Sequence, residues 1–202
     1  MLVTRRRFLQ VGGTLSMGAV LAACLGGDSS KRSRDSSGGA AGRRADATII
    51  RTLSSVEAAA VAAYAVGLDS RLLTPPVANL ANLFRAHHRE HAALFEGTTR
   101  DLGAEPFYGP NPVVMQGLQP AIDTLRDESS VVGLVFDVET ILADTYQATM
   151  GTFADKSFNV AAMSVGGAEA RHAAALAETL GLPPAPQSFE TTERAVPAGS
   201  GV

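Results

Sequence analysis

Three of the four histidines in this chain fall in one short stretch, FRAHHREHAALF, at residues 84–95. Within it His88 and His91 are three residues apart, so on a helix both side chains point the same way. The fourth histidine, His172, follows Glu169 at the same spacing. Imidazole and carboxylate groups paired on one helix face are ligands that transition metals use in proteins.

Each of these pairs is preceded by a second acidic motif. A Val-Glu pair with a Tyr seven residues after the Glu occurs twice, giving Glu57 with Tyr64 and Glu139 with Tyr146. Glu57 lies 34 residues before His91. The chain therefore reads as two copies of one helical hairpin, each with a lone Glu on its first helix and an i, i+3 pair on its second.

The spacing places these motifs at one height. In an antiparallel hairpin, residues equidistant from the turn lie level with each other. The midpoint between Glu57 and His91 is Thr74, at the start of a Thr-Pro-Pro break, and the midpoint between Glu139 and Glu169 falls in the polar break at residues 154–156. If the hairpins pack face to face, six side chains converge: Glu57, His88, His91, Glu139, Glu169 and His172.

Such a cluster is costly inside a helical core unless it is compensated. Buried carboxylates and imidazoles without partners each cost several kcal/mol, on the order of the penalties known for isolated buried charges. A bound cation removes that penalty because the oxygens and neutral ring nitrogens become its ligands. The pattern therefore predicts an internal metal site.

The elements that position these residues are predicted from apolar periodicity and breakers. Apolar stripes predict helices over about 48–69, 75–102, 129–153 and 157–180. Residues 104–119 are rich in Pro and Gly and are predicted to form no regular helix, with a short helix following at 121–127.

Composition limits the class of protein. The 202 residues fit one domain with tails, and 46% hydrophobic residues without Trp favour a compact helical protein. The net charge is −3, or −6 once Arg5, Arg6 and Arg7 are set aside, so no nucleic-acid partner is expected. A single Cys excludes an internal disulfide framework.

The first 24 residues read as an export signal. Arg5 and Arg6, with Phe8 and Leu9 after them, resemble a twin-arginine signal, and the apolar run that follows ends in a segment that resembles a bacterial lipobox at Cys24. This resemblance implies lipidation of Cys24 and a membrane partner through the lipid anchor. The alternative is an ordinary cleaved signal with an incidental cysteine. Residues 25–46 are predicted to be a disordered linker and residues 183–202 a disordered tail.

In residues 47–182 the motifs, taken in order, resemble the ferritin-like superfamily, in particular exported bacterial proteins with a ferritin-like domain. The resemblance implies an all-α, antiparallel four-helix bundle with a long crossover between its second and third helices. It also implies a two-metal site held by one Glu from each of two helices and a Glu-x-x-His motif from each of the other two. Iron is the first candidate, with manganese and zinc as others.

One departure from that family pattern lies in the second helix. His88 stands where the family has Glu, and Glu90 points about 160° around the helix from the His88 position. Three carboxylates with two divalent ions leave a net charge of +1, where four carboxylates give neutrality. This leaves room for a single Fe, Mn or Zn ion instead of two irons.

Other residues keep a second interpretation. Glu57 could be a helix cap, because it follows Ser54 in a capping-box pattern. His87 is interpreted as a residue at the edge of the site or on the surface. Tyr64 and Tyr146 are interpreted as core residues, or as hydroxyls that hydrogen-bond a ligand.

Two functions follow from this sequence. The first is metal-dependent redox chemistry, either oxidation of Fe(II) or reduction of peroxide or O₂, in an exported protein at the outer face of the cytoplasmic membrane. The second is a non-catalytic stress or interaction protein whose metal is structural or absent. A monomer or homodimer is expected instead of a closed storage cage, and neither catalytic residues nor a redox partner are identified.

Overall fold

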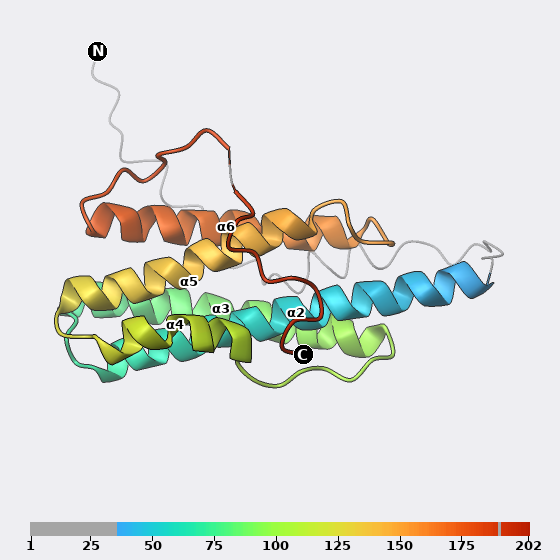
Figure 1. Cartoon of the computed structure of the whole chain (residues 1–202), viewed down its shortest axis with the longest axis horizontal. Helices are drawn as coiled ribbons and strands as arrows, with labels where there is room; N and C mark the ends of the chain where they lie inside the picture. Colours follow the sequence, from blue (N-terminus) through green and yellow to red (C-terminus); the bar gives the residue numbers. More distant parts are fainter. Residues whose placement is uncertain (1–35, 190) are drawn as a thin grey trace, which may run out of the picture. The chain divides into compact units, whose positions relative to one another are not determined.

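The computed structural model describes residues 36–189 and 191–202, and these contain helices and no strand. Four long helices form a bundle: α2 (Ser36–Asp69), α3 (Pro75–Asp101), α5 (Glu128–Thr149) and α6 (Phe158–Thr179). α2 pairs with α3, α5 pairs with α6, and α2 packs against α5 (Figure 1). The shorter α4 (Pro112–Asp123) lies against α2 and α5. The predicted all-α bundle is confirmed.

The long crossover carries the chain from one end of the bundle to the other. After α3 ends, residues 102–127 return to the turn between α2 and α3, where the Thr74 backbone N–H donates to Glu128 at the start of α5 (2.5 Å). α5 therefore runs antiparallel to α2 (Figure 1). The two hairpins are joined as the predicted topology requires.

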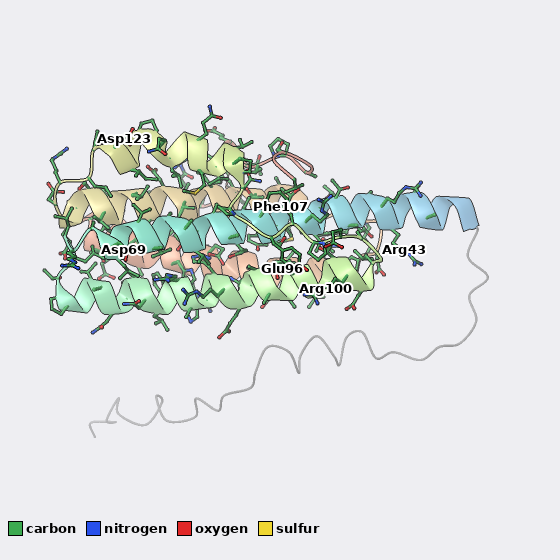
Figure 2. All side chains as sticks on the ribbon, turned by 90° about the horizontal axis from the view of Figure 1, so that it is seen from below. Arg43, Asp69, Glu96, Arg100, Phe107 and Asp123 are labelled. Atoms are coloured by element: carbon green, nitrogen blue, oxygen red, sulfur yellow. The ribbon has the colours of Figure 1, made fainter. Side chains whose placement is uncertain are left out.

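Apolar side chains fill the interior and charged side chains cover the outside. Ile50, Leu53 and Val56 of α2 are buried, as the predicted stripe requires. Arg43, Arg100 and Asp123 are exposed on the outer helix faces (Figure 2). Among the described residues, α2 alone is long and apolar enough to cross a membrane, but 67% of its apolar window is buried in the bundle, so we assign it to the core.

The first helix is longer than predicted. Residues 36–46, predicted to be linker, form the first turns of α2. This segment holds three alanines, which favour a helix, but also three glycines, which do not, so local propensity alone does not explain the extension. Asp46 fixes this extension, because its buried carboxylate accepts backbone N–H groups of Ala154 (2.7 Å) and Asp155 (2.9 Å) in the α5–α6 turn. The signal prediction for residues 1–24 and the linker prediction for 25–35 lie outside the described residues.

The prediction that residues 104–119 form no regular helix is wrong at its C-terminal part. α4 begins at Pro112 because Asn111 caps it, accepting hydrogen bonds from the backbone of Val113 and Val114. Its Val114 and Leu118 are buried against the bundle. Tertiary burial thus outweighs the local breakers, and α4 ends at Asp123, where the predicted short helix was to continue to residue 127.

The C-terminal residues also pack on the bundle, where a disordered tail was predicted. The buried carboxylate of Asp144 on α5 accepts hydrogen bonds from the Thr191 hydroxyl and the Arg194 backbone, both at 2.8 Å. Val196 is 7% exposed. A buried carboxylate requires such partners, so the segment is held by a polar anchor that composition does not reveal.

Gly166 sets the distance between α5 and α6. A Cβ built on Gly166 lies 2.7 Å from the Cβ of Tyr146, whereas nothing lies within 4 Å of one built on Gly167. We expect Gly166→Ala to lower the free energy of unfolding by about 1–3 kcal/mol through overpacking. Gly167→Ala should raise it by about 0.5–1 kcal/mol, because alanine favours the helix. Urea unfolding followed by circular dichroism measures both, and equal shifts would contradict this account.

Candidate metal centre

All six predicted ligand side chains meet in the interior of the bundle. Each of the four long helices contributes, and every one of these residues is at most 4% exposed. α2 supplies Glu57, α3 supplies His88 and His91, α5 supplies Glu139, and α6 supplies Glu169 and His172. Because α2 is continuous through Glu57, the capping interpretation of that residue is excluded. Glu90 is exposed and lies outside the cluster.

The six residues form two overlapping groups of four. Within each group, donor atoms lie within 4.8 Å of one another. The first group joins Glu57 and His91, and the second joins Glu139 and His172. His88 and Glu169 belong to both groups.

Distances in the first group fit a shared ion. His88 Nδ1 lies 2.8 Å from Glu57 Oε2, His91 Nδ1 lies 2.9 Å from Glu169 Oε1, and His91 Nδ1 lies 3.5 Å from Glu57 Oε2. Two ligands of one ion with tetrahedral or octahedral geometry are roughly 2.8–3.6 Å apart when each bond is about 2.0–2.2 Å. The observed separations match neighbouring positions in one coordination shell.

The second group has the same spacing. His88 Nε2 lies 3.0 Å from Glu139 Oε1. His172 Nδ1 lies 3.2 Å from Glu169 Oε2 and 3.5 Å from Glu139 Oε2. A mixed set of carboxylate oxygens and imidazole nitrogens suits Fe, Mn or Zn.

Three donor atoms in the cluster are buried without a hydrogen-bond partner: His91 Nδ1, Glu139 Oε2 and Glu169 Oε1. His91 Nδ1 and Glu169 Oε1 lie close together, but their directions fit no hydrogen bond. Unpaired buried polar atoms are rare in folded proteins because each costs about 1–3 kcal/mol. A cation in the first group would satisfy His91 Nδ1 and Glu169 Oε1, and a cation in the second would satisfy Glu139 Oε2, so these residues fit a metal.

Two tyrosines fix the lone carboxylates across the bundle. The Tyr64 hydroxyl of α2 donates to Glu139 Oε1 of α5 at 2.5 Å, and the Tyr146 hydroxyl of α5 donates to Glu57 Oε1 of α2. Burial and the neighbouring carboxylates raise the pKa of both tyrosines well above the ordinary value, so both hydroxyls stay protonated donors. The ligand-bonding interpretation of these tyrosines agrees with the structure.

Tyr64→Phe and Tyr146→Phe test this support. Each removes one hydroxyl and frees one carboxylate to rotate, so we expect metal affinity to fall by about 10–100-fold, as for other outer-shell partners of metal ligands. Tyr108→Phe is the matched control, because that side chain is 64% exposed. Competition titration with a coloured chelator gives the affinities. Equal values for all three variants would show that the hydroxyls do not support the ligands.

His87 forms the edge of the site. It is half-buried, and its Nδ1 lies 3.0 Å from Nε2 of His172. Phe84 stacks on the His172 ring, with centroids 4.0 Å apart. His87 thus holds the outer nitrogen of His172 and leaves Nδ1 for the donor group. Burial and the nearby His172 lower the pKa of His87, which favours its neutral form.

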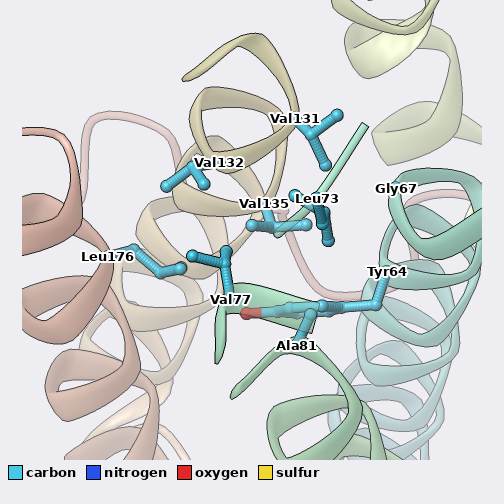
Figure 3. Close-up of a pocket in the computed structure, with 9 residues that line it drawn as sticks. All are labelled: Tyr64, Gly67, Leu73, Val77, Ala81, Val131, Val132, Val135 and Leu176. Carbon is cyan, nitrogen blue, oxygen red and sulfur yellow. The ribbon is translucent and has the colours of Figure 1, made fainter. Parts of the chain in front are cut away.

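The interior next to Tyr64 is apolar. Its ring borders a cavity of about 10 Å³, roughly the room of one water molecule, lined otherwise by aliphatic side chains and Gly67 (Figure 3). Val132, Val135 and Leu176 are among them. A water there finds too few polar partners to be held, so this side of the site stays dry.

Charges inside the cluster compensate one another. Burial acts to raise the pKa of Glu57 and of Glu139, but contacts with His88 and a second histidine lower both below their usual range. Burial and the charge of Glu57 raise the pKa of Glu169 to about 7. Burial acts to lower the pKa of His91, yet its contacts with Glu169 and Glu57 raise it to about 9.

Metal binding is therefore expected to release protons. An ion must displace the proton on His91 below about pH 9, the proton on Glu169 below about pH 7, and the protons on His88 and His172, whose pKa values the neighbouring carboxylates raise. Apparent affinity should rise with pH, and most steeply below about 7, where His88, His91 and Glu169 all carry a proton. Calorimetry in two buffers of different ionisation enthalpy counts the released protons. An affinity independent of pH, without proton release, would contradict these assignments.

Comparison with known proteins identifies the fold family. A family model described as a ferritin-like domain matches residues 45–182, which is more than half of the chain. No curated protein and no solved structure gives a match. The matched range contains all six candidate ligands, and the bundle has the helical architecture expected of that family. The chain therefore belongs to the ferritin-like domain family.

Proposed function

We propose that this protein binds transition-metal ions between its two helical hairpins and uses them for redox chemistry. Iron is the first candidate and manganese the second; zinc, which has no redox chemistry, would fit the site only in a structural role. The observation that carries this proposal is the pair of overlapping, fully buried donor groups with three unpartnered donor atoms. A cation in each donor group would give those atoms a partner.

The expected reaction is oxidation of Fe(II) or reduction of peroxide or O₂. A redox metal supplies the electron transfer when bound. The residues of the chain hold and orient it: Glu57 and Glu139 bind as carboxylates fixed by the two tyrosines, and His91 and His172 bind through Nδ1. The surrounding apolar side chains limit access of water.

The test is metal content by mass spectrometry on full-length protein recovered from its own export pathway, with Glu139→Ala and His172→Ala beside it. About two irons per chain, one for each donor group, and a clear loss in both variants would support the proposal. One zinc or manganese per chain would indicate a mononuclear structural site. A well-folded protein without metal would overturn it.

One observation favours a second function, a non-catalytic stress or interaction protein on the same scaffold. Each carboxylate already lies against an imidazole: Glu57 and Glu139 flank His88 at 2.8 and 3.0 Å, and Glu169 lies 2.9 Å from His91. Such a network can persist without an ion. The visible spectrum after addition of Fe(II) and air separates the two, because the redox site becomes coloured and the scaffold stays colourless.

Export and anchoring complete the proposal, on the basis of residues 1–24 alone. We expect Arg5→Lys with Arg6→Lys to block export. We also expect Cys24→Ser to release the exported protein from the membrane. Fractionation of cells followed by immunoblotting measures both, and a membrane-bound Cys24→Ser variant would exclude the lipid anchor.

A further inference from the structure

His88 occupies a position unlike that of the other histidines. It is 0% exposed, and its two ring nitrogens face carboxylates from opposite hairpins. Nδ1 faces Glu57 at 2.8 Å and Nε2 faces Glu139 at 3.0 Å. By contrast, His172 directs only Nδ1 into the cluster, since its Nε2 faces His87.

Glu169 spans the same two groups from the other side. Its Oε1 lies 2.9 Å from His91 Nδ1, and its Oε2 lies 3.2 Å from His172 Nδ1. By their shortest contacts, His88 and Glu169 each reach the two groups through different atoms, although Glu169 Oε2 also lies 3.6 Å from His88 Nδ1. Each of the other four candidate ligands belongs to one group. Beside these two shared side chains, the first group contains Glu57 and His91, and the second contains Glu139 and His172.

We propose that His88 bridges two metal ions, binding one through Nδ1 together with Glu57 and His91 and the other through Nε2 together with Glu139 and His172. Glu169 forms the second bridge through its two oxygens. This inference rests on the proposed metal-binding function. It assigns His88 a role that neither a terminal ligand nor a hydrogen-bonded core histidine has.

Charge in the buried site supports this assignment. Three glutamates with two divalent ions leave one uncompensated positive charge in an interior where unpaired charge is costly. A ring bound through both nitrogens has given up both N–H protons and carries one negative charge. The sum is then neutral, so a bridging His88 does electrostatically what a fourth carboxylate does at this position.

The bridge also sets the separation of the ions. The two nitrogens of an imidazole lie on different edges of the ring, so ions bound to both stand farther apart than ions that share an oxygen atom. His88 should therefore hold the ions as two linked centres. Replacing it by Glu should preserve binding of both ions but change how they are linked.

The experiment is nuclear magnetic resonance of the histidine rings in full-length, ¹⁵N-labelled protein loaded with Zn(II), which is diamagnetic. The chain has four histidines, so four ring patterns are expected. In a bridged site His88 has no N–H and both its nitrogens show metal-bound shifts, while His91 and His172 each retain one N–H. Zinc content should be about two per chain, one for each donor group.

Variants assign the signals and separate the outcomes. His88→Gln should remove the pattern without N–H and reduce bound zinc to about one ion, while His88→Glu should keep about two ions and show no bridging ring. Glu90→Gln is the control, because that side chain is exposed and outside the cluster. Should His88→Gln fail to fold, the wild-type and His88→Glu spectra decide.

Zinc binding with one N–H retained on His88 would overturn the bridge alone, because the protein would then bind metal without a bridging His88. One zinc ion per folded wild-type chain also overturns the bridge. No zinc bound to folded protein overturns both the bridge and the proposed function.

Discussion

Glu169→Gln is expected to weaken the binding of both metal ions by on the order of 100-fold or more, because even outer-shell changes cost about 10–100-fold. Glu169 is the one carboxylate that belongs to both donor groups. Glutamine keeps its size but has no charge and offers a poorer ligand oxygen. Metal content after dialysis, with affinities from chelator competition, measures the loss.

Single-group ligands should behave differently. Glu57→Gln should remove the ion of the first group and Glu139→Gln the ion of the second, each leaving about one ion per chain. Glu178→Gln is the matched control on α6, because its side chain is exposed. If Glu169→Gln lost no more metal than Glu57→Gln, Glu169 would serve one group only.

His88→Ala is expected to destabilise the metal-free protein by about 3–5 kcal/mol, the usual cost of removing one partner of a buried ion pair. Glu57 and Glu139 are 0% exposed, and both face this ring. Burial opposes the charged ring, but the carboxylates raise the pKa of His88 well above its ordinary value. Protonated His88 therefore contributes stability that is full below about pH 6.5 and is lost only as pH rises through the higher folded-state value.

The pH dependence of this loss follows from the carboxylates left behind. Without His88, the carboxylates of Glu57 and Glu139 can become neutral by taking up protons. The loss of unfolding free energy in His88→Ala should therefore shrink as pH falls toward the ordinary glutamate pKa of about 4.3. His87→Ala is the control, and its half-buried ring should cost about 0.5–1.5 kcal/mol. Urea unfolding with chelator present gives the free energy of unfolding of both variants. Equal losses would contradict the claim that His88 stabilises the two buried carboxylates.

Both predictions depend on features that the sequence contains. Helical periodicity places His88 and His91, and Glu169 and His172, in pairs on single helix faces. The nearly equal spacing from each lone Glu across its turn sets their common height. These are local regularities of one helix or one hairpin, and the structure places all six residues together as predicted.

The hydrogen-bond partners of the two tyrosines could not be predicted from local spacing. Tyr64 and Tyr146 each follow a lone Glu by seven residues, so a role next to the ligands was visible in the sequence. The sequence did not show that each hydroxyl bonds the Glu of the other hairpin. It showed only that residues two turns apart on one helix are too distant to touch. The crossed pairing requires α2 and α5 to be packed against each other.

By itself, then, the sequence determined the bundle, its six candidate ligand residues and their common level, since these follow from helix geometry and hairpin symmetry. The tertiary structure decided the crossed tyrosines, the two-sided contact of His88, the extension of α2 at Asp46 and the C-terminal segment on Asp144. In each of these a buried polar group takes its partner from a distant part of the chain. Such pairings are settled by which surfaces meet and by the cost of leaving a buried donor or acceptor unpaired.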